Sequence, residues 1–258
     1  MKIDVHMHIT QPLELLTEQL RKTGFDRAYL CSSAVARGEL IDSLETAREV
    51  MGRVAGVQNQ AGDCTVSQIN RALAEEIRRY PALLRGFGKV DLFQPDIAAA
   101  VGEIAELGLS GIGEIVGIHG NTGRLALVLE AAEARSLPVF LHTDYPVDPG
   151  DLKEIAAQAK KYRGTQIILG HMGGNFWMDA VAIARETPNV WLDTSEIVNQ
   201  VALQVAVNTV PDRVLFSTDF PWDVPESMEA RVAALRVSEA VKAAVLGGNA
   251  ARLFSKQG

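Results

Sequence analysis

Two of the chain's five histidines lie one residue apart near its start, in the segment DVHMH. If residues 2–9 form a β-strand, His6 and His8 point to the same side of it, together with Asp4, because side chains alternate along a strand. Two imidazoles on one face at the end of a strand are able to bind one metal ion. The pattern also fits two histidines that only form hydrogen bonds in a core, so the pair alone leaves both interpretations open.

The length and composition favour an enzyme that acts on a small molecule. A chain of 258 residues is either two small domains or one barrel, and 47% hydrophobic residues are enough for a large core. No run of 18 apolar residues suggests a membrane span, and the start lacks the layout of a signal peptide. A net charge of −7 without a basic cluster argues against nucleic acid and membrane surfaces as partners. Cys31 and Cys64 form no CxxC pattern and suit a reducing cytosol, so we expect a cytoplasmic protein.

Short apolar, β-branched segments alternate with amphipathic segments along the whole chain. The predicted strands are residues 2–9, 26–33, 85–91, 110–116, 138–144, 166–172, 190–195 and 213–220. Segments of helical period lie between and after them, at 13–23, 42–52 with 66–80, 95–107, 124–135, 151–161, 177–186, 197–208 and, in two pieces, 228–254. Eight such units in this length predict an α/β fold, a (β/α)8 TIM barrel that forms one domain over residues 1–258.

Further ionisable residues fall at the ends of the predicted strands. Glu114 ends the fourth, His142 the fifth, His171 the sixth and Asp219 the eighth. Because active sites of such barrels lie where the strands end, four of the five histidines meet two carboxylates at one rim. Imidazole and carboxylate are ligands for zinc and its first-row neighbours, so we predict a metal site that activates water. His119, in the loop after the fourth strand, receives no ligand role.

The segments DVHMH, PVFLHTD, ILGHMGG and STDFPW, followed by the tail LGGNAARLF, resemble the amidohydrolase superfamily. The resemblance is greatest to its amidohydrolase-related branch, which includes aminocarboxymuconate semialdehyde decarboxylase, and extends from Asp4 to Phe254. It implies that His6, His8 and His142 bind metal.

The resemblance also implies two catalytic residues. Asp219 would bind metal and act as the general base that shuttles a proton. His171 matches a histidine that, in decarboxylase-type members, stays unligated and acts on the nucleophile.

Glu114 decides between one metal ion and two. Its position resembles the bridging glutamate of the TatD-type metal-dependent nucleases of the same superfamily, although ILGHMGG and the acidic charge argue against nuclease activity. A bridging carboxylate would hold two ions about 3.5–4 Å apart. The two ligand sets would be His6, His8, Glu114 and Asp219, and Glu114, His142 and His171. We favour two Zn²⁺ ions, while the ligands also suit Mn, Fe, Co or Ni; one ion results if Glu114 only supports a histidine ligand.

The expected function is hydrolysis of a small amide, lactone or ester by metal-activated water. The alternative is a metal-dependent decarboxylase of a small aromatic or unsaturated carboxylic acid. We place the lyase second because no arginine ends a predicted strand, and only Arg37 and Arg124 are loop candidates for holding the acid. A barrel that binds metal without turnover is the third possibility.

Other residues near the predicted rim are candidates for substrate contacts. Asp144 follows His142, and Trp177 and Trp222 could line an apolar pocket or only pack loops onto the barrel. Asp193 and Ser195 end the seventh strand and could also touch substrate. Cys31 lacks a base partner, so we interpret it as a buried, unreactive thiol. A homodimer is possible, since such dimers are common.

Overall fold

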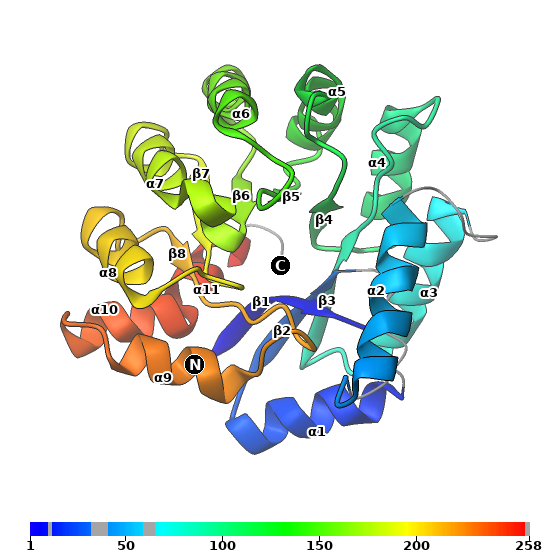
Figure 1. Cartoon of the computed structure of the whole chain (residues 1–258). Helices are drawn as coiled ribbons and strands as arrows, with labels where there is room; N and C mark the ends of the chain where they lie inside the picture. Colours follow the sequence, from blue (N-terminus) through cyan, green and yellow to red (C-terminus); the bar gives the residue numbers. More distant parts are fainter. Residues whose placement is uncertain (10–11, 32–40, 59–64, 256–258) are drawn as a thin grey trace.

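The computed structural model describes residues 1–9, 12–31, 41–58 and 65–255. Its strands form one parallel sheet in the order β1 to β8 (Figure 1). Backbone hydrogen bonds from Val5 N to Phe216 O and from His8 N to Phe220 O join β1 to the segment after β8, which closes the barrel. This architecture confirms the predicted (β/α)8 TIM barrel. The strands are β1 Ile3–His8, β2 Arg27–Cys31, β3 Leu84–Gly88, β4 Gly111–Ile115, β5 Val139–His142, β6 Ile167–Gly170, β7 Val190–Asp193 and β8 Val214–Leu215.

Helices surround the sheet as an outer ring (Figure 1). The predicted helices at 13–23 and 177–186 match α1 and α7 residue for residue, whereas region 228–254 divides into more pieces than predicted. None of the helices in the described ranges is long and apolar enough to cross a lipid bilayer. The helices are α1 Leu13–Thr23, α2 Leu44–Gln58, α3 Val66–Arg78, α4 Ile97–Glu106, α5 Thr122–Glu133, α6 Pro149–Lys161, η1 His171–Phe176, α7 Trp177–Glu186, α8 Gln200–Thr209, α9 Pro225–Ala233, α10 Glu239–Ala243, η2 Ala244–Gly248 and α11 Asn249–Phe254.

Strand β8 is much shorter than the predicted segment 213–220. Beyond it, side chains replace regular backbone pairing: Ser217 Oγ accepts two backbone hydrogen bonds from the segment after β7, and Thr218 Oγ1 donates to Asp4 Oδ2 at 2.7 Å. The apolar spacing of RVLFSTDF cannot reveal this exchange, because a hydroxyl satisfies the same backbone groups as a neighbouring strand. Asp219 therefore lies on irregular backbone rather than on a strand.

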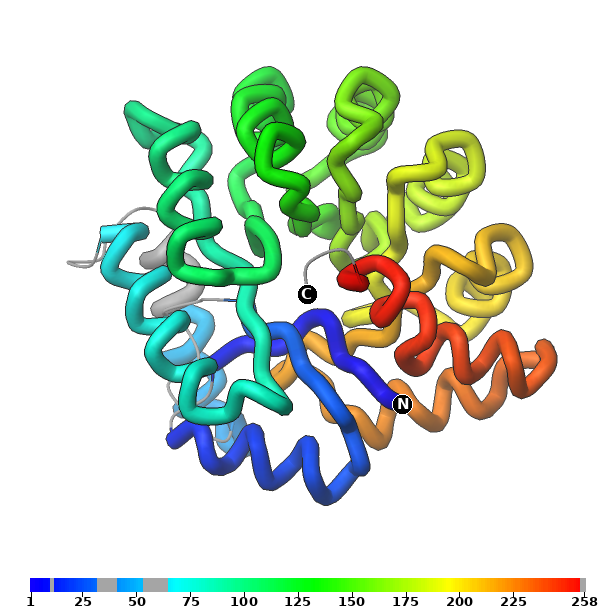
Figure 2. The backbone as a smooth tube through the Cα atoms, turned by 180° about the vertical axis from the view of Figure 1, so that it is seen from behind, coloured from blue at the N-terminus to red at the C-terminus, as the bar shows by residue number. Residues whose placement is uncertain are grey.

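The barrel interior is filled by aromatic side chains from neighbouring strands. The ring of Phe87 lies 5.6 Å from that of Tyr29 and 5.7 Å from that of Phe140. At the amino-terminal end of the barrel, Phe254 of α11 stacks on Tyr29 with ring centres 4.0 Å apart. Figure 2 shows this last helix in red, beside the centre of the barrel when it is viewed from behind. Helix α11 thus closes the end of the barrel opposite to the predicted site.

A register shift in β1 decides which of its side chains enter the barrel. The pairing of β1 with β2 shifts between Asp4 and Met7. Val5 belongs to the interior cluster, and the His6 ring nevertheless lies 4.6 Å from the interior ring of Phe140. The expectation that Asp4 shares a face with the two histidines is therefore wrong, because the irregularity breaks the alternation between them.

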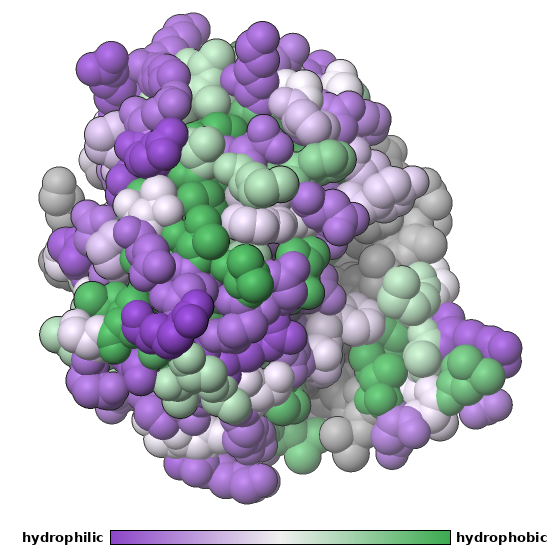
Figure 3. Space-filling view, turned by 60° about the vertical axis from the view of Figure 1, so that its left-hand side comes forward, coloured by the Kyte–Doolittle hydropathy of each residue, from purple (hydrophilic) through white to green (hydrophobic). Residues whose placement is uncertain are grey.

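Helices α7 and α8 form part of the outer surface of the barrel. The face of α7 and α8 mixes apolar and polar side chains (Figure 3), and Val201 and Val205 of α8 are exposed there. The homodimer stays a prediction.

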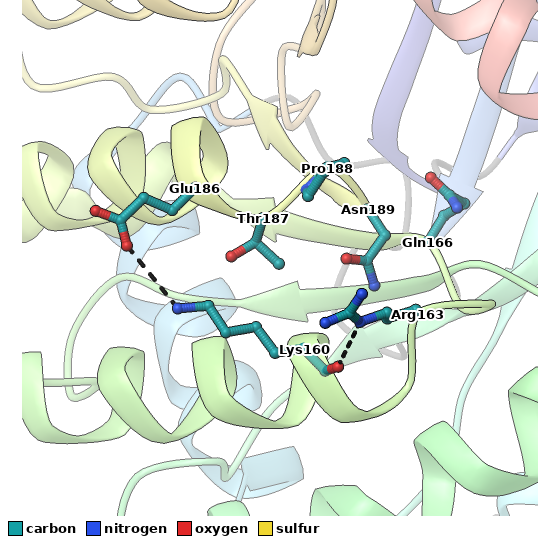
Figure 4. Close-up of a pocket in the computed structure, with 7 residues that line it drawn as sticks. All are labelled: Lys160, Arg163, Gln166, Glu186, Thr187, Pro188 and Asn189. Atoms are coloured by element: carbon teal, nitrogen blue, oxygen red, sulfur yellow. Dashed lines mark hydrogen bonds and ion pairs between the residues drawn. The ribbon is translucent and has the colours of Figure 1, made fainter.

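A pocket of about 390 Å³ lies at the amino-terminal ends of β6 and β7 (Figure 4). Its polar groups largely satisfy one another: Lys160 Nζ lies 3.8 Å from Glu186 Oε2, and Arg163 Nε donates to Lys160 O at 3.1 Å. The Asn189 amide donates to three backbone carbonyls. This pocket belongs to the connections that hold the helices to the barrel.

Candidate metal centre

The six side chains predicted to bind metal converge at the carboxyl ends of the strands. They come from three strands and from two segments that follow strands: His6, His8, Glu114, His142, His171 and Asp219. In each of two groups the ligand atoms lie within 4.8 Å of one another, namely His6, His8 and Glu114, and Glu114, His142 and His171. The structure brings together the residues that the sequence singled out, and their role as ligands remains a prediction.

The two carboxylate oxygens of Glu114 face different histidines. Oε1 lies 2.8 Å from His142 Nδ1 and 3.1 Å from His171 Nε2. Oε2 lies 3.8 Å from His6 Nε2. A carboxylate in this position is able to bind one cation through each oxygen.

Asp219 faces the histidines of β1. Its Oδ1 lies 2.8 Å from His8 Nε2 and 3.3 Å from His6 Nε2. Among the described residues, His6 Nε2 and Asp219 Oδ1 are buried polar atoms that form no hydrogen bond. Leaving such an atom unsatisfied costs about 1–3 kcal/mol. A cation between the imidazole and the carboxylate would satisfy both atoms, so this donor set fits a divalent metal ion.

The Ser195 hydroxyl contacts the Nδ1 atoms of two imidazoles, on the side of each ring away from the site. Its Oγ lies 3.2 Å from His6 Nδ1 and 3.0 Å from His171 Nδ1, and it donates its proton to Asp193 Oδ1. Because a hydroxyl has a single proton, both histidines must donate their Nδ1–H groups to Ser195. When these rings are neutral, their Nε2 lone pairs face the site, which is the state in which a histidine binds a metal.

Two site residues have backbone in the left-handed region, with φ of 55° at His171 and 57° at Asp219. Residues other than glycine rarely adopt this conformation. Here it is held by hydrogen bonds from His171 N to Asp193 Oδ1 at 3.0 Å and from Asp219 N to His6 O at 2.8 Å. Backbone strain that the surroundings enforce is typical of functional sites.

The charges of the cluster stabilise one another. Burial opposes ionisation of Glu114, but the charges of His142 and His6, with hydrogen bonds from His142 and His171, hold its pKa well below the usual range. Burial also opposes protonation of His171, yet the hydrogen bond and charge of Glu114 raise its pKa to about 9. A metal ion that binds these histidine nitrogens must therefore displace protons.

A family model described as amidohydrolase matches residues 3–256. The chain belongs to the amidohydrolase family. Among curated relatives of this amidohydrolase, the gamma-resorcylate decarboxylase of Polaromonas sp. is 26% identical over 250 residues, covering 74% of this chain and 76% of the relative.

Solved structures share the fold of this amidohydrolase. The 5-carboxyvanillate decarboxylase of Sphingomonas paucimobilis matches with a TM-score of 0.65 at 19% identity, over 98% of each chain. A dihydroxybenzoic acid decarboxylase of Polaromonas sp., with bound manganese and the inhibitor 2-nitroresorcinol, matches with a TM-score of 0.62 at 21% identity, over 98% of this chain and 96% of that one.

The prediction that this member of the amidohydrolase family catalyses hydrolysis is wrong. A curated relative, 26% identical, is a decarboxylase, which favours the lyase alternative. The prediction of a divalent metal site is supported by the groups of potential ligands, while the choice of two zinc ions is not confirmed. The lyase ranked second only because no arginine ends a strand, and this criterion overlooked a lysine in the same position, Lys89.

The residues Asp193 and Ser195 have a different place from the one predicted. Both are completely buried behind the histidines, where they cannot touch a substrate in the mouth. They orient His6 and His171 instead, as the carboxylate and hydroxyl partners of metal-binding histidines commonly do. The DTS tripeptide at the end of β7 is the only sequence signal for this role.

Two residues of the site were missed. Glu196, whose side chain is 44% exposed, has its Oε2 3.7 Å from His171 Nδ1 and forms another potential ligand group with His171 and Asp219. Lys89 directly follows β3, and burial lowers its pKa while the charges of Asp91 and Glu114 oppose that shift. Sequence reasoning placed Lys89 inside a strand, which hid its position at the mouth.

The predicted substrate-contacting residues have different surroundings. Asp144 lies against Gly174, where an added Cβ would be 1.9 Å from Asp144 Oδ1, so the loop after β5 touches the loop after β6. Trp177 is half-buried against the core between sheet and helices, whereas Trp222 is 36% exposed. Substrate contact by Asp144, Trp177 and Trp222 remains a prediction.

His119 and Cys31 are not members of the six-residue cluster. His119 Nδ1 lies 2.7 Å from Asp151 Oδ2, at the start of α6, and this pair is separate from the six-residue cluster. Cys31 is buried, and burial raises the pKa of its thiol to about 11, which makes it a poor nucleophile.

Proposed function

We propose that this amidohydrolase is a metal-dependent decarboxylase of a small aromatic carboxylic acid with hydroxyl groups on its ring. The observation that carries the proposal is the cluster of potential metal ligands around Glu114 and Asp219 in a chain whose curated relative is gamma-resorcylate decarboxylase. The substrates named for the structural neighbours, 5-carboxyvanillate and dihydroxybenzoic acid, belong to the same chemical class.

The proposed centre would hold two divalent ions, with Glu114 available to both. His6, His8 and Asp219 would hold one ion, and His142 and His171 the other. Bound there, the metal supplies positive charge that attracts and polarises the oxygen atoms of an acidic substrate. Manganese fits this mixture of imidazole and carboxylate ligands.

Decarboxylation defines what the protein's own residues must do. The bond between the ring carbon and the carboxylate carbon breaks, its electron pair stays on the ring, and a proton must bond to the ring carbon as CO₂ leaves. We assign this proton to the Asp219 carboxyl group, because this carboxyl group lies in the mouth beside His6 and His8.

The reaction is tested with manganese-loaded protein and 2,6-dihydroxybenzoate. We expect one CO₂ and one resorcinol for each acid consumed, measured by gas analysis and chromatography. The methyl ester of the same acid is the matched control and should remain intact. A panel of hydroxybenzoic acids that releases no CO₂, under conditions where the protein retains metal, would contradict the proposal.

The number of ions is tested by elemental mass spectrometry. Two equivalents per chain that fall to one or none in Glu114→Ala would support a bridging carboxylate. One equivalent that the substitution leaves unchanged would refute it. Glu103→Ala is the control, since Glu103 lies on α4 and pairs with Arg71 rather than with the site.

A further inference from the structure

The side chain of Lys89 points into the mouth of the barrel. Along β3, Phe87 belongs to the interior cluster, whereas a Cβ added to Gly88 would meet Ile104, which lies between sheet and helices. Val90 also packs in that outer layer. Because side chains alternate along an extended chain, Lys89, between two residues that face outward, continues the inward series above Phe87.

Asn70 holds the backbone of Lys89 in this extended state. Its Oδ1 accepts a hydrogen bond from Lys89 N at 2.7 Å, and its Nδ2 donates to Lys89 O at 2.9 Å. Asn70 comes from α3 and is only 1% exposed. One amide side chain thus supplies the donor and the acceptor that a neighbouring strand would supply.

The inward series places Lys89 at the level of the candidate metal centre. The Phe87 ring lies 5.7 Å from that of Phe140, which in turn lies 4.6 Å from the His6 ring. Lys89 is two residues further toward the mouth than Phe87. In the sheet, Gly88 pairs with Ile112, which is two residues before Glu114. Lys89 and Glu114 therefore enter the mouth from neighbouring strands.

Arg124, one of the two arginines considered for holding the acid, is engaged elsewhere. Its Nε donates to Leu92 O at 2.6 Å, and its guanidinium carbon lies 5.1 Å from the centre of the Phe93 ring. Arg37, the other candidate, lies outside the described residues. By contrast, among the described residues no carboxylate oxygen lies within 4.0 Å of the Lys89 ammonium group.

We propose that Lys89 is the specificity-determining residue that binds the carboxylate of the substrate, and that Asn70 positions it. The proposal rests on the decarboxylase function above. The mouth already contains the carboxylates of Glu114, Asp219 and Glu196, so an anionic substrate needs a cation of the protein there as well as the metal. The negative charge of the carboxylate is greatest before CO₂ leaves and moves to the ring as the bond breaks. Lys89 therefore strengthens substrate binding more than it accelerates bond cleavage.

The test compares an acid with its own neutral product. Binding of 2,6-dihydroxybenzoate and of resorcinol to the manganese-loaded protein is measured by calorimetry, because the two molecules differ only in the carboxylate. In Lys89→Met we expect the Kd of the acid to rise about 10- to 100-fold, the effect of one charge-assisted hydrogen bond. The Kd of resorcinol should change less than about twofold.

Further variants separate charge from structure. Lys89→Arg should restore most of the affinity for the acid, and Asn70→Ala should lose affinity for the acid selectively. Lys153→Met, on the exposed surface of α6, is the control for the same chemical change. In steady-state assays KM should rise while kcat changes little.

Two kinds of failure are distinguishable. An equal loss of affinity for acid and product in Lys89→Met, or an unchanged affinity for the acid, would overturn the role of Lys89 even if the wild-type protein decarboxylates. Absence of CO₂ release from wild-type protein would refute the decarboxylase function, while the binding comparison would still decide whether Lys89 recognises a carboxylate. Wild-type protein that does not bind the acid at all would overturn both.

Discussion

Replacement of Ser195 by alanine tests whether the buried hydroxyl sets the metal-binding state of two histidines. The variant removes the acceptor of the His6 and His171 Nδ1–H groups, at 3.2 and 3.0 Å. His6 keeps Asp193 Oδ2 at 3.4 Å, whereas the nearest carboxylate to His171 Nδ1 is Glu196 Oε2 at 3.7 Å. We therefore expect the larger effect on the ligand set that contains His171.

The expected loss of metal affinity follows from the effect of similar hydrogen bonds to metal-binding histidines in other proteins. Their loss typically lowers metal affinity about 10- to 100-fold, which is about 1.4–2.7 kcal/mol. The assay is a competition titration of Mn²⁺ against a chromogenic chelator with wild-type and Ser195→Ala proteins. Ser110→Ala, at the start of β4 and remote from the site, is the control.

The result that would refute this reasoning is simple to recognise. If Ser195→Ala binds both ions within about twofold of wild type, the hydroxyl does not orient the two rings for metal. Ser195 would then serve only to satisfy Asp193 in the core.

Three further predictions concern the proton donor, a loop and a titrating pair. Asp219→Asn should lower kcat for decarboxylation by about 100-fold or more at saturating manganese, because it removes the proposed proton donor; unchanged kcat would exclude that role. Gly174→Ala should lower the free energy of unfolding by about 2–5 kcal/mol. The φ of 53° disfavours any side chain, and the added Cβ would clash with Asp144 Oδ1. Gly120→Ala, with a φ of 68° and open space around the position, should lower the free energy of unfolding by only about 1–2 kcal/mol. Urea titration of both variants measures the difference. The hydrogen bond to Asp151 raises the pKa of His119 above 6.5, so its stabilising contribution is complete below that pH and is lost as pH rises through the raised value. His119→Gln should therefore lower Tm more at pH 6 than at pH 9; an equal loss at both would contradict this linkage.

The sequence predicted the barrel well because the patterns that mark its helices and its strands are both local. Helices α1 and α7 carry an apolar stripe at helical spacing, and strands such as β6 are short apolar runs bounded by polar residues. The convergence of His6, Glu114 and His171 then follows from the fold itself, since parallel strands end at one face. Periodicity could not predict the irregular backbone after β8, where hydroxyl groups replace strand pairing.

The residues behind and above the metal centre were harder to predict. Ser195 and Asp193 are ordinary polar residues in the sequence, and only the three-dimensional arrangement shows that they face imidazoles rather than solvent. Lys89 was hidden by an error of three residues in the end of β3. Its role depends on Asn70, which lies 19 residues earlier in the chain on another element. The reaction class was missed for a related reason, because the predicted ligand set suits either reaction and the residues around it are hard to place from the sequence.

The closure of the barrel by α11 has a consequence for how small molecules enter and leave the site. Phe254, Tyr29, Phe87 and Phe140 form a continuous column of rings from that helix to the His6 imidazole. Within the part of the chain that the structure describes, this column closes the amino-terminal end, so in the proposed reaction acid, arene and CO₂ would all use the carboxyl-end mouth. If the proposed reaction takes place, substrate and product share one opening, and the arene must leave before the next acid enters.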